Sequence, residues 1–100
     1  MIETREGLEN VEEITAVDGV DVVHVGSNDL LLDMGMPGKF GSSEHIAAIE
    51  RVIDACAANG KVAGLGGERD LARQVDFIRK GVKFVTTQTD LRFLQIAATN

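Results

Sequence analysis

Short, nearly continuous apolar runs alternate with amphipathic segments along the whole chain, and this alternation constrains the fold more than any other feature. The apolar runs are rich in β-branched residues, as strands buried on both faces are. Such an order of strand and helix is typical of a parallel β-sheet with helices packed on it. Four predicted strands result if the opening residues are the end of a first strand: 1–3, 20–26, 61–67 and 82–88.

Each predicted strand is followed by a segment whose apolar residues recur at helical spacing. The predicted helices cover residues 8–17, 42–60, 68–81 and 90–99. Ser43 is the expected N-cap of the second helix and Gly60 its end, and Asp90 or Thr89 is the expected cap of the last. The residues expected to face the sheet are Leu8, Val11, Ile14 and Val17, then Ile46, Ile49, Ile53 and Cys56, then Leu71, Val75 and Ile78.

Composition excludes several classes of function. The net charge of −6 disfavours nucleic-acid binding, which depends on clustered positive charge. No apolar run approaches the roughly 18 residues needed to span a membrane, and the early acids Glu3 and Glu6 argue against a signal peptide. The single cysteine, Cys56, cannot form an internal disulfide, and we expect it to be a buried structural thiol. A cytoplasmic protein is therefore expected.

Chain length leaves two architectures open. A closed (β/α)₈ barrel needs eight strand–helix units and about 250 residues, whereas this chain has 100. The pattern therefore fits either half of such a barrel or a small open α/β domain. The longest irregular stretch is residues 33–43, which contains Pro37 between Gly and Met residues. A loop of this length is a candidate functional loop, and Met34 and Met36 are expected to pack over a site or against a partner subunit.

Two acids lie where predicted strands end, Glu3 after the first and Asp29 shortly after the second. In parallel α/β folds the loops after the carboxyl ends of the strands build the site, and neighbouring strands are about 4.8 Å apart. The two carboxylates could therefore share a divalent cation such as Mg²⁺ or Mn²⁺. The alternative is that Glu3 caps the next helix and Asp29 shapes a turn.

The segment 64–70, "GLGGERD", is a weaker candidate for a phosphate-binding loop, because it follows a strand and precedes a helix. It lacks the third glycine of the dinucleotide fingerprint. The favoured interpretation is that its glycines leave room for a substrate.

Two motifs identify a resemblance to a known family. The segments "IET-x-x-G" at residues 2–7 and "VGSNDL-x-x-x-MG-x-PG" at residues 25–38 resemble those of the HpcH/HpaI aldolases. These are metal-dependent class II pyruvate aldolases and include 4-hydroxy-2-oxoheptanedioate aldolase. The resemblance continues through "AAIERVIDACAANGKVAG" and "GVKFVTTQTDLRFL", so it covers essentially the whole chain.

The resemblance implies a (β/α)₈ TIM barrel of which residues 1–100 form the C-terminal half, one domain of about four β/α units with parallel strands. It implies that Glu3 and Asp29 bind the divalent metal and that the backbone amides of Asn28 and Asp29 bind the carboxylate of pyruvate. The implied reaction is the reversible aldol cleavage of a 4-hydroxy-2-oxo acid to pyruvate and an aldehyde. The implied assembly is a homo-oligomer.

The family's acid–base histidine and its arginine are expected upstream of "IET", so no catalytic residue is assigned in this chain. His24, within a strand, is expected to be packed or at the surface, and His45, in the first turn of a helix, to be solvated. Arg5 receives no catalytic role. Two alternatives remain: a catalytically incomplete fragment that binds metal without turnover, and a small non-enzymatic α/β ligand-binding or interaction module.

Overall fold

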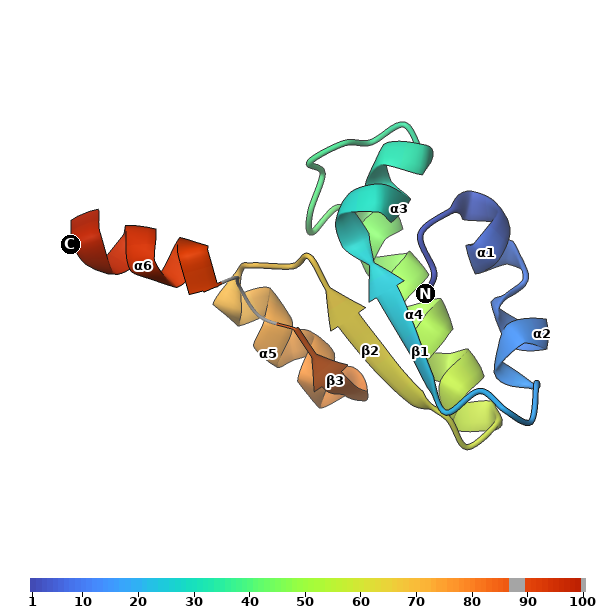
Figure 1. The fold of residues 1–100 in the computed structure, drawn as a ribbon. Helices are drawn as coiled ribbons and strands as arrows, with labels where there is room; N and C mark the ends of the chain where they lie inside the picture. The colour runs from blue at the N-terminus through green and yellow to red at the C-terminus, as the bar shows by residue number, and fades with distance from the viewer. Residues whose placement is uncertain (87–89, 100) are drawn as a thin grey trace.

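The computed structural model describes residues 1–86 and 90–99, and a sheet of three parallel strands lies at its centre (Figure 1). The order is β1 (Val22–Gly26), β2 (Val62–Gly66) and β3 (Val82–Val85), with β2 in the middle. The predicted first strand is reduced to one parallel bridge between Ile2 and Val25, on the free side of β1. The predicted parallel α/β class is confirmed, with three strands and this bridge in place of the four strands expected.

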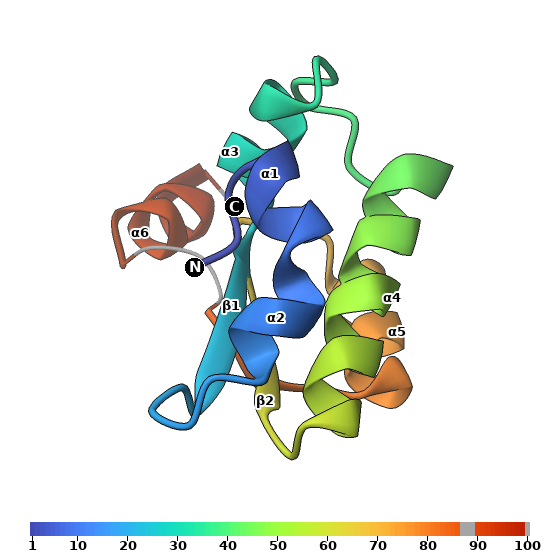
Figure 2. The ribbon, with the colours of Figure 1, turned by 90° about the vertical axis from the view of Figure 1, so that its right-hand side faces the viewer.

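Helices α4 (Ser43–Ala58) and α5 (Leu71–Lys80) cover one face of the sheet (Figure 2). The core lies between this face and the helices. Burial of its apolar surface stabilises the fold by roughly 25 cal/mol of free energy per Å². Most of the predicted apolar stripe of α4 is confirmed, because Ile49, Ile53 and Cys56 are buried. Core members from the other elements include Ile2, Val11, Val23, Val25, Leu30, Leu65, Phe77 and Val82.

The first predicted helix, residues 8–17, is wrong in its extent. The chain forms two short helices instead, α1 (Arg5–Glu9) and α2 (Val11–Thr15), which meet at Asn10. The side-chain amide of Asn10 donates a hydrogen bond to the carbonyl of Glu6 at 3.0 Å, and such local bonds compete with continuous helix. Val11 is buried as expected, whereas Val17 lies beyond α2 and is exposed.

The N-cap of α4 is displaced by one residue from the prediction. Ser42, not Ser43, accepts a hydrogen bond from the backbone N–H of His45, at 3.2 Å. Gly60 follows the end of the helix with a φ of +67°, the left-handed conformation that glycine adopts without strain. The predicted end of this helix is therefore confirmed.

A further helix, α3 (Ser27–Asp33), stands directly after β1, within the motif that the sequence pattern treats as a strand end and loop. Its Leu30 and Leu31 are fully buried. The helix ends before the loop that contains Pro37, so the irregular segment is shorter than predicted. Asp29 consequently lies in the first turn of a helix.

The predicted inner face of α5 is wrong. Its Leu71, Val75 and Ile78 are exposed, whereas Gln74 and Phe77 are buried. Helix α6 (Asp90–Thr99) has no buried residue and projects away from the sheet (Figure 1). The predicted alternative cap Thr89 and the predicted end of the last strand, residues 87–88, lie outside the described residues.

The sheet face opposite α4 and α5 is largely uncovered. Val22 on β1 and Phe84 on β3 are both exposed, at 44% and 51%. His24 lies on this face, half-buried, with its ring edge to the ring of Phe84 at 5.7 Å between centroids. Within the described ranges no helix is long and apolar enough to cross a membrane.

Candidate active site

A cavity of about 220 Å³ opens at the carboxyl ends of β1 and β2. It brings together all three residues that the sequence predicts as a site: Glu3, Asn28 and Asp29. The arrangement follows from topology, because parallel strands present their carboxyl ends at one edge of a sheet. The other residues that line it are Met1, His24, Gly26, Ser27, Gly66, Gly67 and Thr86.

Glu3 reaches this cavity because the last residue of β1 is a glycine. A Cβ atom on Gly26 would lie 3.0 Å from Cγ of Glu3 and 3.3 Å from its Oε1. A larger residue at this position would displace the carboxylate. Glu3 does not cap the following helix, because Thr4 does so by accepting a hydrogen bond from the N–H of Gly7 at 3.0 Å.

Asn28 and Asp29 are both exposed in the first turn of α3. An acid in this position interacts favourably with the positive end of the helix dipole. Asp29 also lines a separate hollow on the surface together with Glu3, Thr4, Leu32 and Asp33. The alternative in which Asp29 shapes a turn is therefore wrong: Asp29 lies in a helix and lines the same cavity as Glu3.

His45 is fully buried, so the expectation that it is solvated is wrong. Its Nδ1 accepts a hydrogen bond from the N–H of Gly41 at 3.0 Å, and its Nε2 lies 3.2 Å from Oγ of Ser27. The ring packs edge-on between Phe40 and Phe77. Burial lowers the pKa of His45, and this effect exceeds the opposing influence of the nearby Glu68. The position of His45 near the start of a helix did not by itself predict that the ring is buried and hydrogen-bonded on both nitrogen atoms.

His24 lines the cavity beside Glu3, a position that sequence reasoning missed. Gly64 and Gly66 on β2 make room for its imidazole, because a Cβ at either position would overlap a ring nitrogen. The imidazole of His24 therefore occupies the space beside Gly64 and Gly66, while Gly66 and Gly67 still line the cavity. Desolvation lowers the pKa of His24, and the charge of the N-terminus adds to this. The sequence signal for this position was that His24 alternates with Val23 and Val25, so that it faces the opposite side of the sheet from these two buried residues.

The segment 64–70 is organised around a buried carboxylate. Glu68 is 1% exposed, and its Oε2 pairs with Nε of Arg73 at 2.9 Å. Its Oε1 accepts the backbone N–H of Asp70, also at 2.9 Å, and its carbonyl accepts a hydrogen bond from the side chain of Gln74. The backbone N–H of Asp70 is thus bonded within the chain, whereas a phosphate-binding loop would leave such an N–H free for its ligand.

The donors at the cavity suit a hard divalent cation in part. Glu3 and Asp29 provide carboxylate oxygens, the ligand type that Mg²⁺ and Mn²⁺ prefer. Among residues 1–86 and 90–99 no group of three or more His, Cys, Asp or Glu side chains could hold a metal ion. The cavity therefore offers a cation two protein carboxylates, and the other coordination positions of the cation would be left for substrate oxygens and water.

Fold and cavity together define an α/β chain with parallel strands and acidic side chains at the strand ends. Residues 1–95 match the HpcH/HpaI aldolase/citrate lyase family, and the chain belongs to this family. It is a family of metal-dependent class II aldolases.

Curated relatives are aldolases that act on 2-oxo acids. The chain is 43% identical to the 4-hydroxy-4-methyl-2-oxoglutarate aldolase of Chaetomium globosum, over 98% of this chain and 37% of the relative. It is 39% identical to the 4-hydroxy-2-oxo-heptane-1,7-dioate aldolase of Escherichia coli, over 97% of this chain and again 37% of the relative. The chain thus spans less than two fifths of the length of these relatives.

A solved structure of the family agrees with the fold. The HpcH/HpaI aldolase from Desulfitobacterium hafniense matches with a TM-score of 0.89 at 28% identity, over 98% of this chain and 38% of that chain. The fold is therefore that of part of an HpcH/HpaI aldolase, a TIM-barrel family.

Proposed function

We propose that this chain is the part of a class II pyruvate aldolase that binds the metal and pyruvate. The proposed reaction of the whole protein is the reversible aldol cleavage of a 4-hydroxy-2-oxo acid to pyruvate and an aldehyde. The observation that carries the proposal is that Glu3, Asn28 and Asp29 line one cavity at the strand ends of a family member. The chain is proposed to be the C-terminal half of the barrel.

Glu3 and Asp29 are the proposed protein ligands of a Mg²⁺ or Mn²⁺ ion. When bound, such a cation supplies Lewis-acid stabilisation of the negative charge that develops on a 2-oxo acid during aldol chemistry. The absence of a side chain on Gly26 leaves room for the carboxylate of Glu3, and Asp29 lies in the first turn of α3, so the two acids line the same cavity.

The backbone amides of Asn28 and Asp29 are the proposed partners of the pyruvate carboxylate. Both residues lie in the first turn of α3, where backbone N–H groups have no acceptor within the helix. Ser27 begins this helix and is buried, with its hydroxyl held by His45. This hydrogen bond between α3 and α4 therefore fixes the residue directly before the two amides.

The proposed substrate class is a dicarboxylic 4-hydroxy-2-oxo acid. The two relatives described above act on 4-hydroxy-4-methyl-2-oxoglutarate and 4-hydroxy-2-oxo-heptane-1,7-dioate, and each compound has a carboxylate at both ends.

A second proposal is favoured for the isolated chain, because it spans 37% of these relatives. In that proposal the chain binds metal and pyruvate but does not turn over.

A pyruvate titration tests the proposed function. Calorimetry with the full chain is expected to detect pyruvate binding with Mn²⁺ present and little or none without it. Asp29→Asn should abolish the metal dependence. Asp18→Asn makes the same charge change at an exposed position before β1 and should behave as the wild type. Equal pyruvate binding with and without Mn²⁺ would contradict the proposal.

A further inference from the structure

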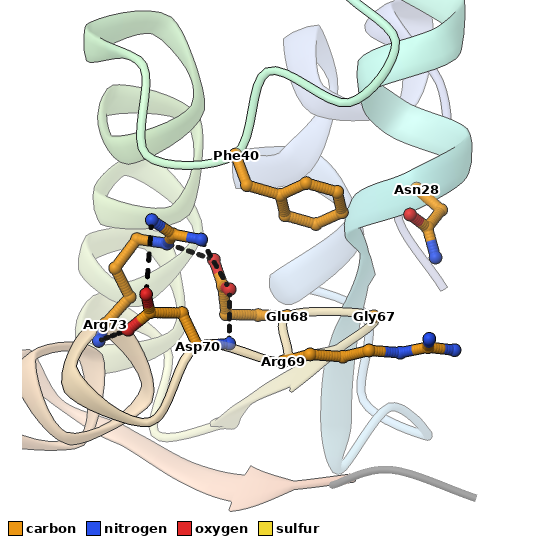
Figure 3. Close-up of a pocket in the computed structure, with 7 residues that line it drawn as sticks. All are labelled: Asn28, Phe40, Gly67, Glu68, Arg69, Asp70 and Arg73. Atoms are coloured by element: carbon orange, nitrogen blue, oxygen red, sulfur yellow. Dashed lines mark hydrogen bonds and ion pairs between the residues drawn. The ribbon is translucent and has the colours of Figure 1, made fainter. Parts of the chain in front are cut away.

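A second cavity, of about 330 Å³, adjoins the proposed pyruvate site (Figure 3). The two cavities share Asn28 and Gly67. Gly67 has a φ of +83°, and a Cβ on it would lie 3.3 Å from both nitrogen atoms of Asn28. The backbone at Gly67 can therefore pass close to Asn28, and the two cavities lie next to each other at this point. The remaining lining residues are Phe40, Glu68, Arg69, Asp70 and Arg73.

Most of the charge in this second cavity is already neutralised within the chain. The guanidinium of Arg73 pairs with Glu68, through Nε at 2.9 Å and Nη2 at 3.2 Å. It also lies 3.6 Å from the carboxylate of Asp70, which caps helix α5 by accepting the N–H of Arg73. Arg73 is thus already paired with two acids of its own segment.

Arg69 is the remaining cation. Within the described part of the chain no hydrogen bond or ion pair holds its guanidinium, and the residue is exposed. Figure 3 shows that its side chain extends away from the Glu68–Arg73 pair and toward Asn28. It therefore points from the second cavity toward the boundary that this cavity shares with the pyruvate site.

We propose that Arg69 binds the distal carboxylate of a dicarboxylic 2-oxo acid whose 2-oxo acid end occupies the pyruvate site. This inference rests on the proposed function. A guanidinium offers a fork of donors that matches a carboxylate, and such charge-assisted pairs are stronger than neutral hydrogen bonds. Phe40 supplies an apolar wall on the opposite side of the cavity, beside which methylene groups can pack (Figure 3). Arg69 is thus a specificity residue for the half of the substrate that leaves as the second carbonyl product.

Matched ligands separate the contribution of the distal carboxylate. In the presence of Mn²⁺, 2-oxoglutarate and 2-oxopentanoate have the same number of carbon atoms and differ in whether the chain ends in a carboxylate. We expect the wild type to bind 2-oxoglutarate roughly tenfold more tightly, the scale of one charge-assisted hydrogen bond. Arg69→Gln should remove this preference and leave pyruvate binding unchanged. Arg79→Gln, which removes an exposed charge near the far end of α5, should retain the preference.

The outcomes distinguish the two proposals. Pyruvate binding without a preference for 2-oxoglutarate, or with a preference that Arg69→Gln retains, would overturn the role of Arg69 and leave the proposed function standing. Loss of the preference in both arginine variants would indicate a general charge effect and would also overturn it. A wild type that binds no pyruvate in the presence of Mn²⁺ would overturn the proposed function and this inference together.

Discussion

His45 Nε2 lies 3.2 Å from Ser27 Oγ, and this contact joins the first turn of α4 to the residue that begins α3. Because Nδ1 accepts the N–H of Gly41, the ring proton of the neutral imidazole is on Nε2 and donates to Ser27. The same ring therefore anchors both the loop before α4 and the helix that carries Asn28 and Asp29. A buried histidine thus positions the proposed site without lining it.

Replacing His45 by Phe should destabilise the chain by about 1–3 kcal/mol. Phe retains a ring between Phe40 and Phe77, but it leaves the buried Ser27 hydroxyl without its partner, and one buried unpaired group costs about that amount. The N–H of Gly41 also loses its acceptor, but it is only partly buried, so water can replace the bond. Urea unfolding measures the change. Lys39→Gln, exposed in the same loop, should have little effect. An unchanged midpoint for His45→Phe would show that these hydrogen bonds do not stabilise the fold.

Stability should fall as the pH drops below about 6.5, the ordinary pKa of histidine. Burial lowers the pKa of His45 in the folded state, so between 6.5 and this lowered pKa the unfolded chain binds more protons than the folded chain. The free energy of unfolding therefore decreases with falling pH across this window. Unfolding curves between pH 7.5 and 5 should show a smaller slope for His45→Phe. Identical slopes would mean that His45 titrates alike in both states.

The isolated 100-residue chain should assemble rather than remain a monomer. The exposed Leu71, Val75 and Ile78 form an apolar stripe on α5, and the sheet face that carries Phe84 is open. Apolar area left in water costs roughly 25 cal/mol per Å², and large exposed patches usually mark interfaces. Sedimentation at low micromolar concentration should therefore give a mass above that of one chain.

A double substitution tests which surface causes this assembly. Leu71→Ser with Ile78→Ser should shift the distribution toward smaller species, whereas Arg79→Gln on the same helix should not. A compact, folded wild-type species near 10.7 kDa would instead favour a small independent α/β domain.

Little or no aldolase activity is expected from this chain alone. We expect from the resemblance that the acid–base histidine and the arginine of the family lie outside these residues, and loss of such groups commonly reduces rates by about 10²–10³. A coupled assay for pyruvate release with Mn²⁺ and a 4-hydroxy-2-oxo acid measures this. Full activity would show that His24 or another residue of the chain supplies the missing proton transfer.

The sequence predicted what depends on local pattern. Strand–helix alternation identified the parallel sheet, and the positions of Glu3 and Asp29 after strands placed them on one cavity. It did not predict which face of α5 is buried, because the polar Gln74 is satisfied by the carbonyl of Glu68, a contact that no periodicity reveals. Similarly, His45 has a polar side chain near a helix start, and only the tertiary fold supplies its two partners.

Mn²⁺ binding tests the central claim, a metal site shared by Glu3 and Asp29, most directly. The spectrum of free Mn²⁺ measured by electron paramagnetic resonance reports how much of the ion the chain takes up. The account predicts one saturable site in the wild type and in Asp18→Asn, and loss of that site in both Glu3→Gln and Asp29→Asn. Equal Mn²⁺ uptake by all four proteins, or none by the wild type, would contradict it.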